Sequence, residues 1–517
     1  MDVTRLPGRI ATAAALIASG LGGWLFLLHL RMIVSPAPQE MREGAVVWIT
    51  RLLLEGRNPY DLAELPASTN VYGIFYHLVV LPFAMIFGNG FTVHRTVSGL
   101  SILCACVLLY QLLRRKRTDR GFAFVGVLLF YASSLYFVAP LARPDSLGVL
   151  LSMASMTLLF RDNVTPIAFL LGLCFALMAL ATKIYLAYPP FIMAAYVFLY
   201  DSRFRGLAYG LTSAAAAVLL LFTLATFYPA YVNMSLVGNA QTGYEDAAHL
   251  WRQTSDWLVF SLPLTVALVL VAVRGITGAM SARRWRLRPD IFAFASAVNA
   301  GVFLYWLGWH PGAHMTYVFQ LVTPALILAV WPHIGTRAWP RAVVTAALPL
   351  ALVLNAPYFP LTFARFAAAE REFARVARLV EGHQNVLGST EVAGLLALAG
   401  RPVVDSGQSE YFEDTALERP LPGAVPAALL HARWDGFVAA MADDISAERF
   451  DLIVRSRRHG LIPRDLVAEH YRVTDTVDLD FAWASQRWPV DLWTPRRRDL
   501  RHARRGRPQP RSSPLRD

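Results

Sequence analysis

Charged residues are scarce in this sequence of 517 residues. Asp, Glu, Lys and Arg make up 16% of it, hydrophobic residues make up 56%, and the mean hydropathy is +0.42. A typical soluble domain carries about 25% charged residues. This shortage of charge excludes a soluble enzyme and predicts a polytopic integral membrane protein.

Several motifs are also absent. Only three cysteines occur, Cys104, Cys106 and Cys174, and all fall within apolar runs, so the polar parts of the chain can form no disulfide. No phosphate-loop glycine pattern is present, so no nucleotide is predicted. No internal repeat is evident, which removes support for an inverted-repeat transporter.

Apolar runs long enough to approach or exceed the ~18–20 residues of a membrane span are frequent. We expect about eleven spans, at 10–30, 97–113, 121–140, 146–160, 167–182, 184–200, 206–228, 257–273, 291–309, 316–331 and 342–358. Their interiors are almost free of ionisable residues. Ion-coupled transporters and pumps usually need such groups at mid-membrane, so this pattern does not favour transport.

Basic residues predict the orientation. Arg5 and Arg9 precede the first span, and further clusters lie at 114–120, 203–205 and 283–288. If the chain alternates, all of them fall inside, as the positive-inside rule requires. A span at 72–87 would break this pattern, so we interpret that segment as a helix lying in the outer interface. We therefore expect an inner (plasma) membrane protein with a cytoplasmic N-terminus and an extracytoplasmic C-terminal region.

The first 358 residues are predicted to form a polytopic all-α membrane bundle with a large first outer loop at 31–96. From 359 to 495, strand-like segments (385–387, 401–405, 451–454 and 472–477) alternate with helical ones (390–399, 433–442 and 464–470). This alternation predicts a small α/β domain with a mainly parallel sheet. The tail at 496–517, rich in Arg, Pro and Ser, is predicted to be disordered and solvated.

Ionisable residues gather at the outer ends of the predicted spans. The carboxylates are Glu40, Glu43 and Asp145, and the cations are Arg95, Arg143 and Lys183. Glu40 and Glu43 are three residues apart and would share a helix face. Cations suit a phosphate, and carboxylates suit proton transfer. We therefore predict a site at the outer face.

Each of these residues also has a structural interpretation. Glu43 could be a solvated surface group, and Arg143 with Asp145 could be a salt-bridged helix start. The Lys183 side chain could extend to the membrane interface, and Arg95 could anchor its helix at that interface. Glu245 and Asp246 suggest a polar loop, whereas His310 and His314 have metal-pair spacing that Pro311 and Gly312 disfavour. No metal is predicted, and a divalent cation has no support from the sequence.

The order of several motifs carries a resemblance. Acids begin the first outer loop, an EGRNPY turn follows, FGNGFTVHR enters the second span, and RPD opens the fourth. Over nearly the whole chain, this layout resembles the GT-C superfamily of membrane glycosyltransferases, in the branch of lipid A aminoarabinose transferases and protein O-mannosyltransferases. Members usually carry adjacent acids, whereas Met41 and Arg42 separate the two glutamates here.

The resemblance implies transfer of a sugar from a polyprenyl-phosphate donor to a glycan, lipid or protein acceptor at the outer face, with inversion. It implies Glu43 as general base, Glu40 as second candidate, and Asp145 as an orienting carboxylate. It implies that the carrier phosphate is held by cations, for which Arg95, Arg143 and Lys183 are the candidates. Tyr72 and Tyr76 are candidate sugar or lipid contacts.

Two other function classes remain open on sequence alone. A lipid-linked glycan flippase would need a polar path through the membrane, which the apolar spans do not offer. A non-catalytic assembly or sensor protein could use its C-terminal domain as a binding module. Partners in every case include membrane lipids, and nucleic acid is not expected for a chain that lies mostly in a bilayer.

Overall fold

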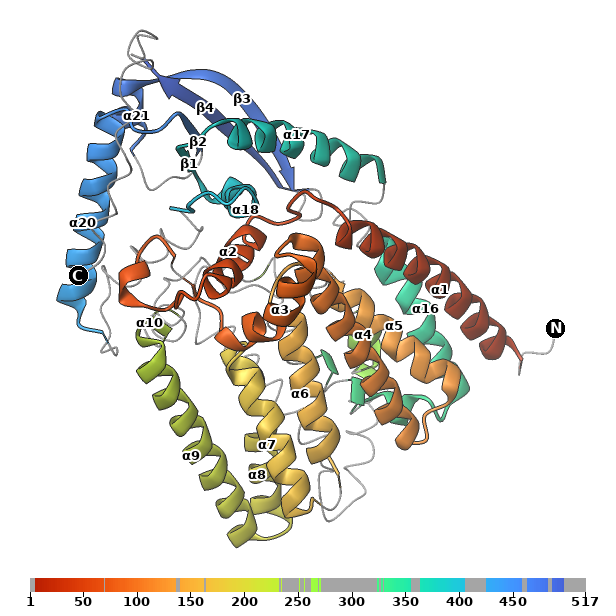
Figure 1. Ribbon diagram of the computed structural model, residues 1–517. Coiled ribbons are helices and arrows are strands. Elements are labelled where there is room, and N and C mark those ends of the chain that lie inside the picture. The colour runs from red at the N-terminus through yellow and green to blue at the C-terminus, as the bar shows by residue number, and fades with distance from the viewer. Residues whose placement is uncertain are drawn as a thin grey trace.

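The computed structural model describes residues 5–68, 70–135, 140–161, 164–231, 331–354, 363–404, 425–457, 463–481 and 486–496, with a few short segments between 234 and 330. A helical bundle accounts for most of these residues, and one four-stranded sheet lies across one end of it (Figure 1).

The bundle and its connections contain α1 (Leu6–Ile33), α2 (Glu43–Leu54), η1 (Leu62–Glu64), α3 (Ile74–Phe87), α4 (Phe91–Arg115), α5 (Arg120–Leu135), α6 (Asp145–Leu159), α7 (Pro166–Leu180), η2 (Ile184–Ala187), α8 (Pro189–Tyr200), α9 (Arg203–Phe227), α10 (Pro229–Tyr231) and α16 (Ala338–Leu354). Of these, α1, α4 and α9 are long and apolar enough to cross a membrane, and α3, α5, α6, α7, α8 and α16 are shorter apolar helices.

The first seven predicted spans and the eleventh each contain one of these helices. The eighth, ninth and tenth lie mostly outside the described residues. The total of eleven spans therefore stays a prediction.

The helix ends show that α3 and its neighbours lie on one side of the bundle. The start of α4 contacts the end of α1, because Arg95 Nη1 donates to Met32 O at 2.9 Å. Only α2, η1 and α3 lie between these two points, so this segment leaves the bundle end and returns to it. With 14 residues, α3 is about 21 Å long, less than the roughly 30 Å of a bilayer core. The interfacial position of the 72–87 segment stays a prediction.

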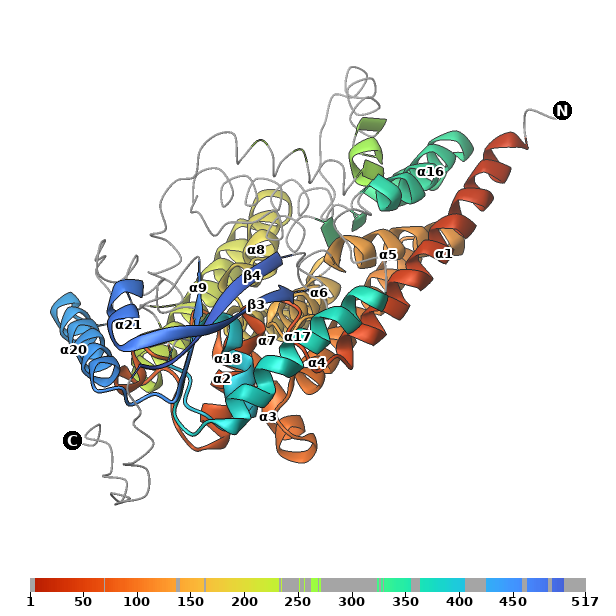
Figure 2. The same cartoon turned by 90° about the horizontal axis from the view of Figure 1, so that it is seen from above.

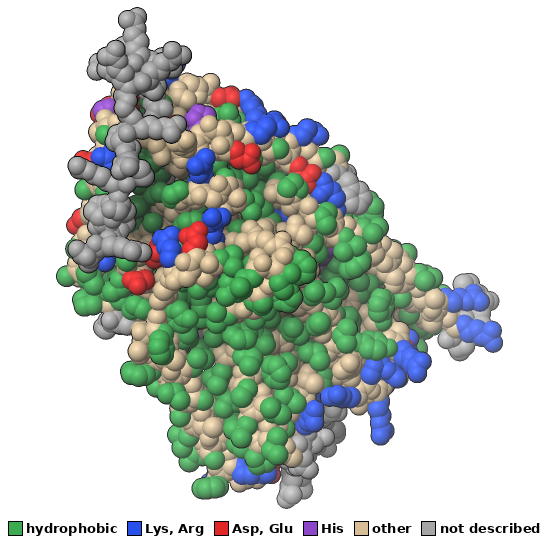
Figure 3. Space-filling view, in the orientation of Figure 1, with side chains coloured by type: hydrophobic (Ala, Val, Ile, Leu, Met, Phe, Trp, Pro, Cys, Tyr) green, Lys and Arg blue, Asp and Glu red, His purple; other side chains and the backbone are tan. Residues whose placement is uncertain are grey.

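Apolar side chains cover much of the outside of the bundle, whereas charged ones gather toward its two ends (Figure 3). On α9, Leu211 is 62% exposed and Phe222 is 71% exposed; on α1, Leu16 is 70% exposed. Soluble monomers rarely expose such large apolar surfaces to water, whereas in a membrane the lipid tails would cover them.

The C-terminal part contains α17 (Phe363–Gly382), β1 (Val386–Gly388), η6 (Thr390–Val392), α18 (Ala393–Leu398), α20 (Ala427–Ser446), β2 (Leu452–Ser456), α21 (Arg464–His470), β3 (Tyr471–Phe481) and β4 (Gln486–Pro495). The strand order is β1-β2-β4-β3. β1 pairs with β2 in parallel, through Leu387 opposite Ile453, but β2–β4 and β3–β4 are antiparallel.

The prediction of a mainly parallel sheet is therefore wrong, and the reason is β4, a strand that the sequence pattern does not reveal. It contains Pro489 and ends at Pro495, and prolines argue against a strand that is paired on both sides. Pro489 has no N–H to donate, but its carbonyl accepts from Arg457 N at 3.0 Å. The strand predicted at 401–405 is also wrong over its described residues, 401–404, which are irregular.

The sheet, α17 and α18 lie over the same end of the bundle as α2 (Figures 1 and 2). The two regions share one hydrophobic core. Trp48 and Leu52 of α2 belong to the same buried cluster as Leu396 of α18, Val376 of α17 and Leu492 of β4. The 31–96 segment is therefore packed between the bundle and the C-terminal domain.

Candidate functional site

A fully buried ion pair joins the 31–96 segment to the first turns of α4. Arg95 and Glu43 have 0% side-chain exposure, and the guanidinium binds the carboxylate in a bidentate manner, with Nε–Oε1 at 2.9 Å and Nη2–Oε2 at 2.6 Å. The other Arg95 donors reach the carbonyls of Met32, Ser35 and Ala37 at 2.7–2.9 Å. All five guanidinium N–H groups are thus used, and Arg95 ties the end of α1 to α4.

Glu43 is saturated in the same way. Besides Arg95, Gln39 N donates to Oε2 at 2.6 Å and Ala142 N donates to Oε1 at 2.7 Å. Each oxygen therefore accepts two hydrogen bonds, and no part of the side chain is exposed. A general base must reach the proton it abstracts. This geometry does not favour the predicted role of Glu43 as base, nor that of Arg95 as a phosphate ligand.

A second cluster of charges lies at the first turn of α6 and the segment after α7. Asp145 Oδ2 lies 3.2 Å from Arg143 Nε, and Lys183 Nζ donates to Asp145 Oδ1. Arg143 Nη2 donates to the Tyr72 hydroxyl at 3.2 Å. Both cations lie 5.8 Å from the centroid of the Tyr72 ring. Three segments distant in sequence therefore meet around one aromatic ring.

Asp145 is buried, but Arg143 and Lys183 keep 13% and 10% of their side chains exposed. Burial lowers the pKa of Lys183 to about 8; Asp145 acts in the opposite direction, and the positive charges of Arg143 and Arg42 lower it further. The two guanidinium groups therefore add to the larger effect of burial, and a bound anion would oppose both.

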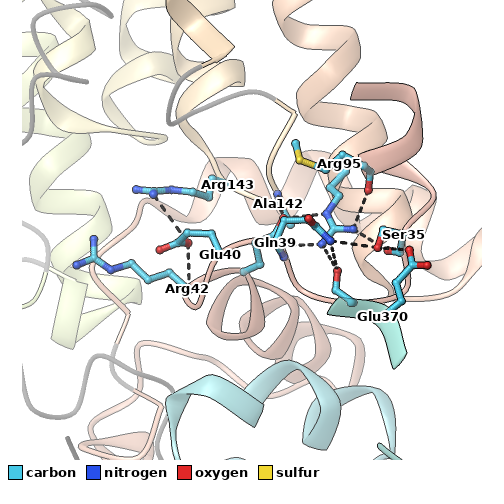
Figure 4. Close-up of polar contacts among 11 residues, drawn as sticks. Ser35, Gln39, Glu40, Arg42, Arg95, Ala142, Arg143 and Glu370 are labelled. Atoms are coloured by element: carbon cyan, nitrogen blue, oxygen red, sulfur yellow. Dashed lines mark hydrogen bonds and ion pairs between the residues drawn. The ribbon is translucent and has the colours of Figure 1, made fainter. Parts of the chain in front are cut away.

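Glu40 lies between the two clusters. Its Oε2 accepts from Arg42 N at 3.0 Å and is 3.9 Å from Arg143 Nη1, and its side chain is 13% exposed. Burial raises the pKa of Glu40. The positive charges of Arg143 and Arg42 lower this pKa, and the negative charge of Glu43 raises it. In Figure 4, the side chains of Arg42 and Arg143 extend to the same side as Glu40, away from Arg95.

The placement of Tyr72 follows from the Asn-Pro-Tyr turn and its surroundings. Asn58 Nδ2 donates to Phe227 O at the end of α9 at 2.9 Å, and the Tyr60 hydroxyl donates to Tyr72 O. Asn70 donates to the Tyr60 hydroxyl at 2.8 Å and accepts from Tyr72 N at 3.0 Å. Asn58 and Tyr60 of the EGRNPY motif thus have a structural function here: they fix the backbone that carries Tyr72.

Gly73 explains why Tyr72 reaches Lys183. Its N–H donates to Thr182 O at 3.1 Å, and a Cβ at this position would lie 1.9 Å from Ala181 O. Only glycine permits this approach of two backbones. The 72–73 segment therefore runs directly beside 181–183.

Tyr76 does not join this cluster. Its side chain is fully buried, and its hydroxyl lies 3.4 Å from His94 Nδ1 and 3.5 Å from Ser98 Oγ of α4. Burial between α3 and α4 does not favour the predicted contact of Tyr76 with a sugar or lipid.

Sequence reasoning missed three contributors. Arg42, which appeared only as a spacer between the glutamates, shares the Glu40 neighbourhood; its charge next to two candidate acids was the available signal. Ser35 and Glu370 support the Arg95 pair from the side of the C-terminal domain, and no local pattern marks either.

No metal centre occurs in the described part of the chain, where no three His, Cys, Asp or Glu side chains could hold an ion together. The predicted residues His310 and His314, Glu245 and Asp246, and the basic tail after Arg496 lie outside the described residues.

No protein-family model and no curated protein matches the chain. Among solved structures, the chain is similar to ArnT from Cupriavidus metallidurans bound to undecaprenyl phosphate, with a TM-score of 0.47 and 15% identity over 85% of this chain and 79% of that one. It is also similar to ArnT in the apo state, with a TM-score of 0.44 and 17% identity over 83% and 79%. ArnT is a GT-C glycosyltransferase, the superfamily that the sequence motifs resemble.

Proposed function

We propose that this protein is a membrane glycosyltransferase that moves a sugar from a polyprenyl-phosphate donor to an acceptor hydroxyl, with inversion, at the extracytoplasmic face of the inner (plasma) membrane. The observation that carries the proposal is the second cluster. Arg42, Arg143 and Lys183 gather with Glu40 and Asp145 next to Tyr72, at the ends of apolar helices.

The cations suit the phosphate of the donor. Among the described residues, this group includes three cations and two carboxylates, and the difference of one matches the single negative charge of a phosphodiester donor. When the bond between the anomeric carbon and the phosphate oxygen breaks, the leaving polyprenyl phosphate gains charge, and its second pKa is about 6. Preorganised cations stabilise that developing charge more than the ground state. Asp145 orients Arg143 and Lys183 for this role.

Glu40 is the base in this mechanism. The acceptor oxygen forms a bond to the anomeric carbon, the phosphate leaves with the electron pair, and the acceptor proton passes to the Glu40 carboxylate. Burial raises the pKa of Glu40, and a base whose pKa approaches the working pH accepts a proton more effectively. Glu43 is a positioning residue that holds the start of α2 through Arg95.

The test is a transfer assay in lipid nanodiscs with radiolabelled polyprenyl-phosphate sugars and Glu40→Gln. Loss of a general base lowers the rate by about 10²–10⁴. The control is Glu55→Gln, which makes the same chemical change at an exposed carboxylate of the same segment and is expected to leave transfer unchanged.

Two outcomes would change the proposal. If Glu40→Gln transfers normally, Glu40 is not the base. If the wild-type protein transfers no sugar from any donor, the glycosyltransferase assignment fails, and movement of lipid-linked glycans between leaflets should be measured next.

A further inference from the structure

The C-terminal domain contacts the 35–44 segment at both of its ends. At one end, a helix of the domain meets the start of α2 backbone to backbone. A Cβ on Gly44 would lie 2.4 Å from Gly394 N, and a Cβ on Gly394 would lie 2.4 Å from Phe91 Cζ. Real Cβ atoms do not approach this closely, so Gly44 is needed for α18 to lie against α2, and Gly394 is needed for it to lie against Phe91 at the start of α4.

Further contacts hold the two helices in register. Arg51 Nη1 donates at 3.1 Å to Ala397 O in the last turn of α18, and the same carbonyl also accepts from Gly400 N at 3.3 Å. Val47 and Trp48 of α2 share a buried cluster with Val392 and Leu396. Because protein interiors are closely packed, a shift of α18 would be passed to α2.

At the other end, α17 reaches the same segment through Glu370 (Figure 4). Its carboxylate accepts from Ser35 Oγ at 2.6 Å and pairs with Arg31 at 2.5 Å. Burial would raise the pKa of Glu370, but the hydrogen bonds from Arg31 and Ser35 outweigh it and lower that pKa. Glu370 is therefore held in its charged form.

Ser35 connects Glu370 to the buried pair. Its carbonyl accepts from Arg95 Nη1 at 2.7 Å, and its hydroxyl accepts from Gln39 Nε2 at 3.1 Å. Gln39 N in turn binds Glu43. Glu40 follows directly in the chain, so its position depends on contacts made at both ends of a ten-residue segment, 35–44.

We propose that the C-terminal domain positions the Glu40 segment for transfer, with Glu370 and the Gly44–Gly394 contact as its two points of attachment. The effect on the reaction rests on the proposed function; the mechanical coupling does not. The domain is then part of the catalytic unit rather than a separate binding module, and Glu370 is a positioning residue that acts through Ser35.

The coupling is tested by amide hydrogen exchange on the full-length protein in nanodiscs. Gly394→Ala forces a methyl group into Phe91 and Gly44, and Glu370→Gln removes the ion pair with Arg31. Matched controls are Gly436→Ala in α20, where a Cβ would meet nothing within 4 Å, and Glu381→Gln at the exposed end of α17. We expect faster exchange over 35–54 in both test variants and wild-type exchange in both controls.

The effect on the reaction is tested by steady-state transfer with the same four variants. A displaced base lowers kcat while the phosphate site keeps its affinity, so kcat should fall by about tenfold to a hundredfold with the donor KM within about twofold of wild type. If a variant is only less well folded, its activity should fall in proportion to the fraction of folded protein. Size-exclusion chromatography measures that folded fraction.

The outcomes separate the two claims. Unchanged exchange in both test variants overturns the coupling, whatever the transfer assay shows. Faster exchange with unchanged kcat overturns the positioning role. If the test variants exchange faster but the wild-type protein transfers no sugar from any donor, the coupling stands and only the proposed function is overturned.

Discussion

Two clusters of opposite charges lie side by side in this protein, and they differ in how far their side chains are exposed. The Glu43–Arg95 pair is fully buried, and every oxygen and N–H group in it has a partner. The cluster around Asp145 and Glu40 is partly exposed, and among the described residues it holds three cations and two carboxylates. A fully buried pair with every group bonded holds elements together, whereas partly exposed charges can meet a ligand.

The largest expected effect is the loss of folding stability when the buried Glu43–Arg95 pair is broken. Breaking a buried ion pair by removing one partner costs about 3–5 kcal/mol of folding free energy. Glu43→Gln should therefore lower stability strongly, because its amide N–H₂ would face Arg95, while Glu40→Gln should leave stability nearly unchanged. Unfolding by SDS titration in mixed micelles measures both. Equal stability of the two variants would remove the distinction between the clusters.

A smaller effect is expected when one cation of the cluster around Asp145 and Glu40 is removed. A hydrogen bond to a charged group contributes about 1.5–3 kcal/mol, which corresponds to roughly 10- to 150-fold in donor affinity or rate. Arg143→Gln should weaken the binding of polyprenyl phosphate by that factor without loss of folded protein. The matched control is Arg57→Gln, an exposed cation of the 31–96 segment paired with Glu64. Normal binding by Arg143→Gln would contradict the phosphate assignment.

The pH dependence of binding should report Lys183. The pKa of Lys183 lies at about 8, so its positive charge is present below that pH and is lost as the pH rises through it. Affinity for polyprenyl phosphate should therefore fall between about pH 7 and 9 in the wild type. In Lys183→Arg the charge persists, because arginine has a pKa above 12, and the decline should disappear. An identical decline in both proteins would assign the titration to another group.

The smallest effect is expected at exposed ion pairs remote from both clusters. Asp201 and Arg205 pair at the start of α9 with side chains 42% and 47% exposed. Such pairs contribute about 0–1 kcal/mol. Asp201→Asn should leave unfolding by SDS and sugar transfer within error of wild type. A clear loss in either measurement would show that charge at that end of the bundle affects the site at a distance.

Much of the architecture follows from local properties of the chain. Long apolar runs require a bilayer, and the structure has helices at those runs wherever they fall in the described residues. The alternation of the C-terminal segments likewise indicates most of its helices and three of its strands. β4 was missed because prolines are unusual in a strand that is paired on both sides. The sheet direction was predicted incorrectly because strands pair with segments distant in sequence, and here β4 lies between β2 and β3.

The site divides in the same way. Charged residues next to apolar runs mark the end of the bundle where chemistry is possible, and these positions are visible in the sequence alone. Which charges pair is not visible, because Glu43 meets Arg95 across 52 residues and Asp145 meets Lys183 across 38. Burial and pairing are properties of such long-range contacts. Only the folded chain could therefore show that Glu43 is fully buried with Arg95 and that Glu40 lies near Arg143.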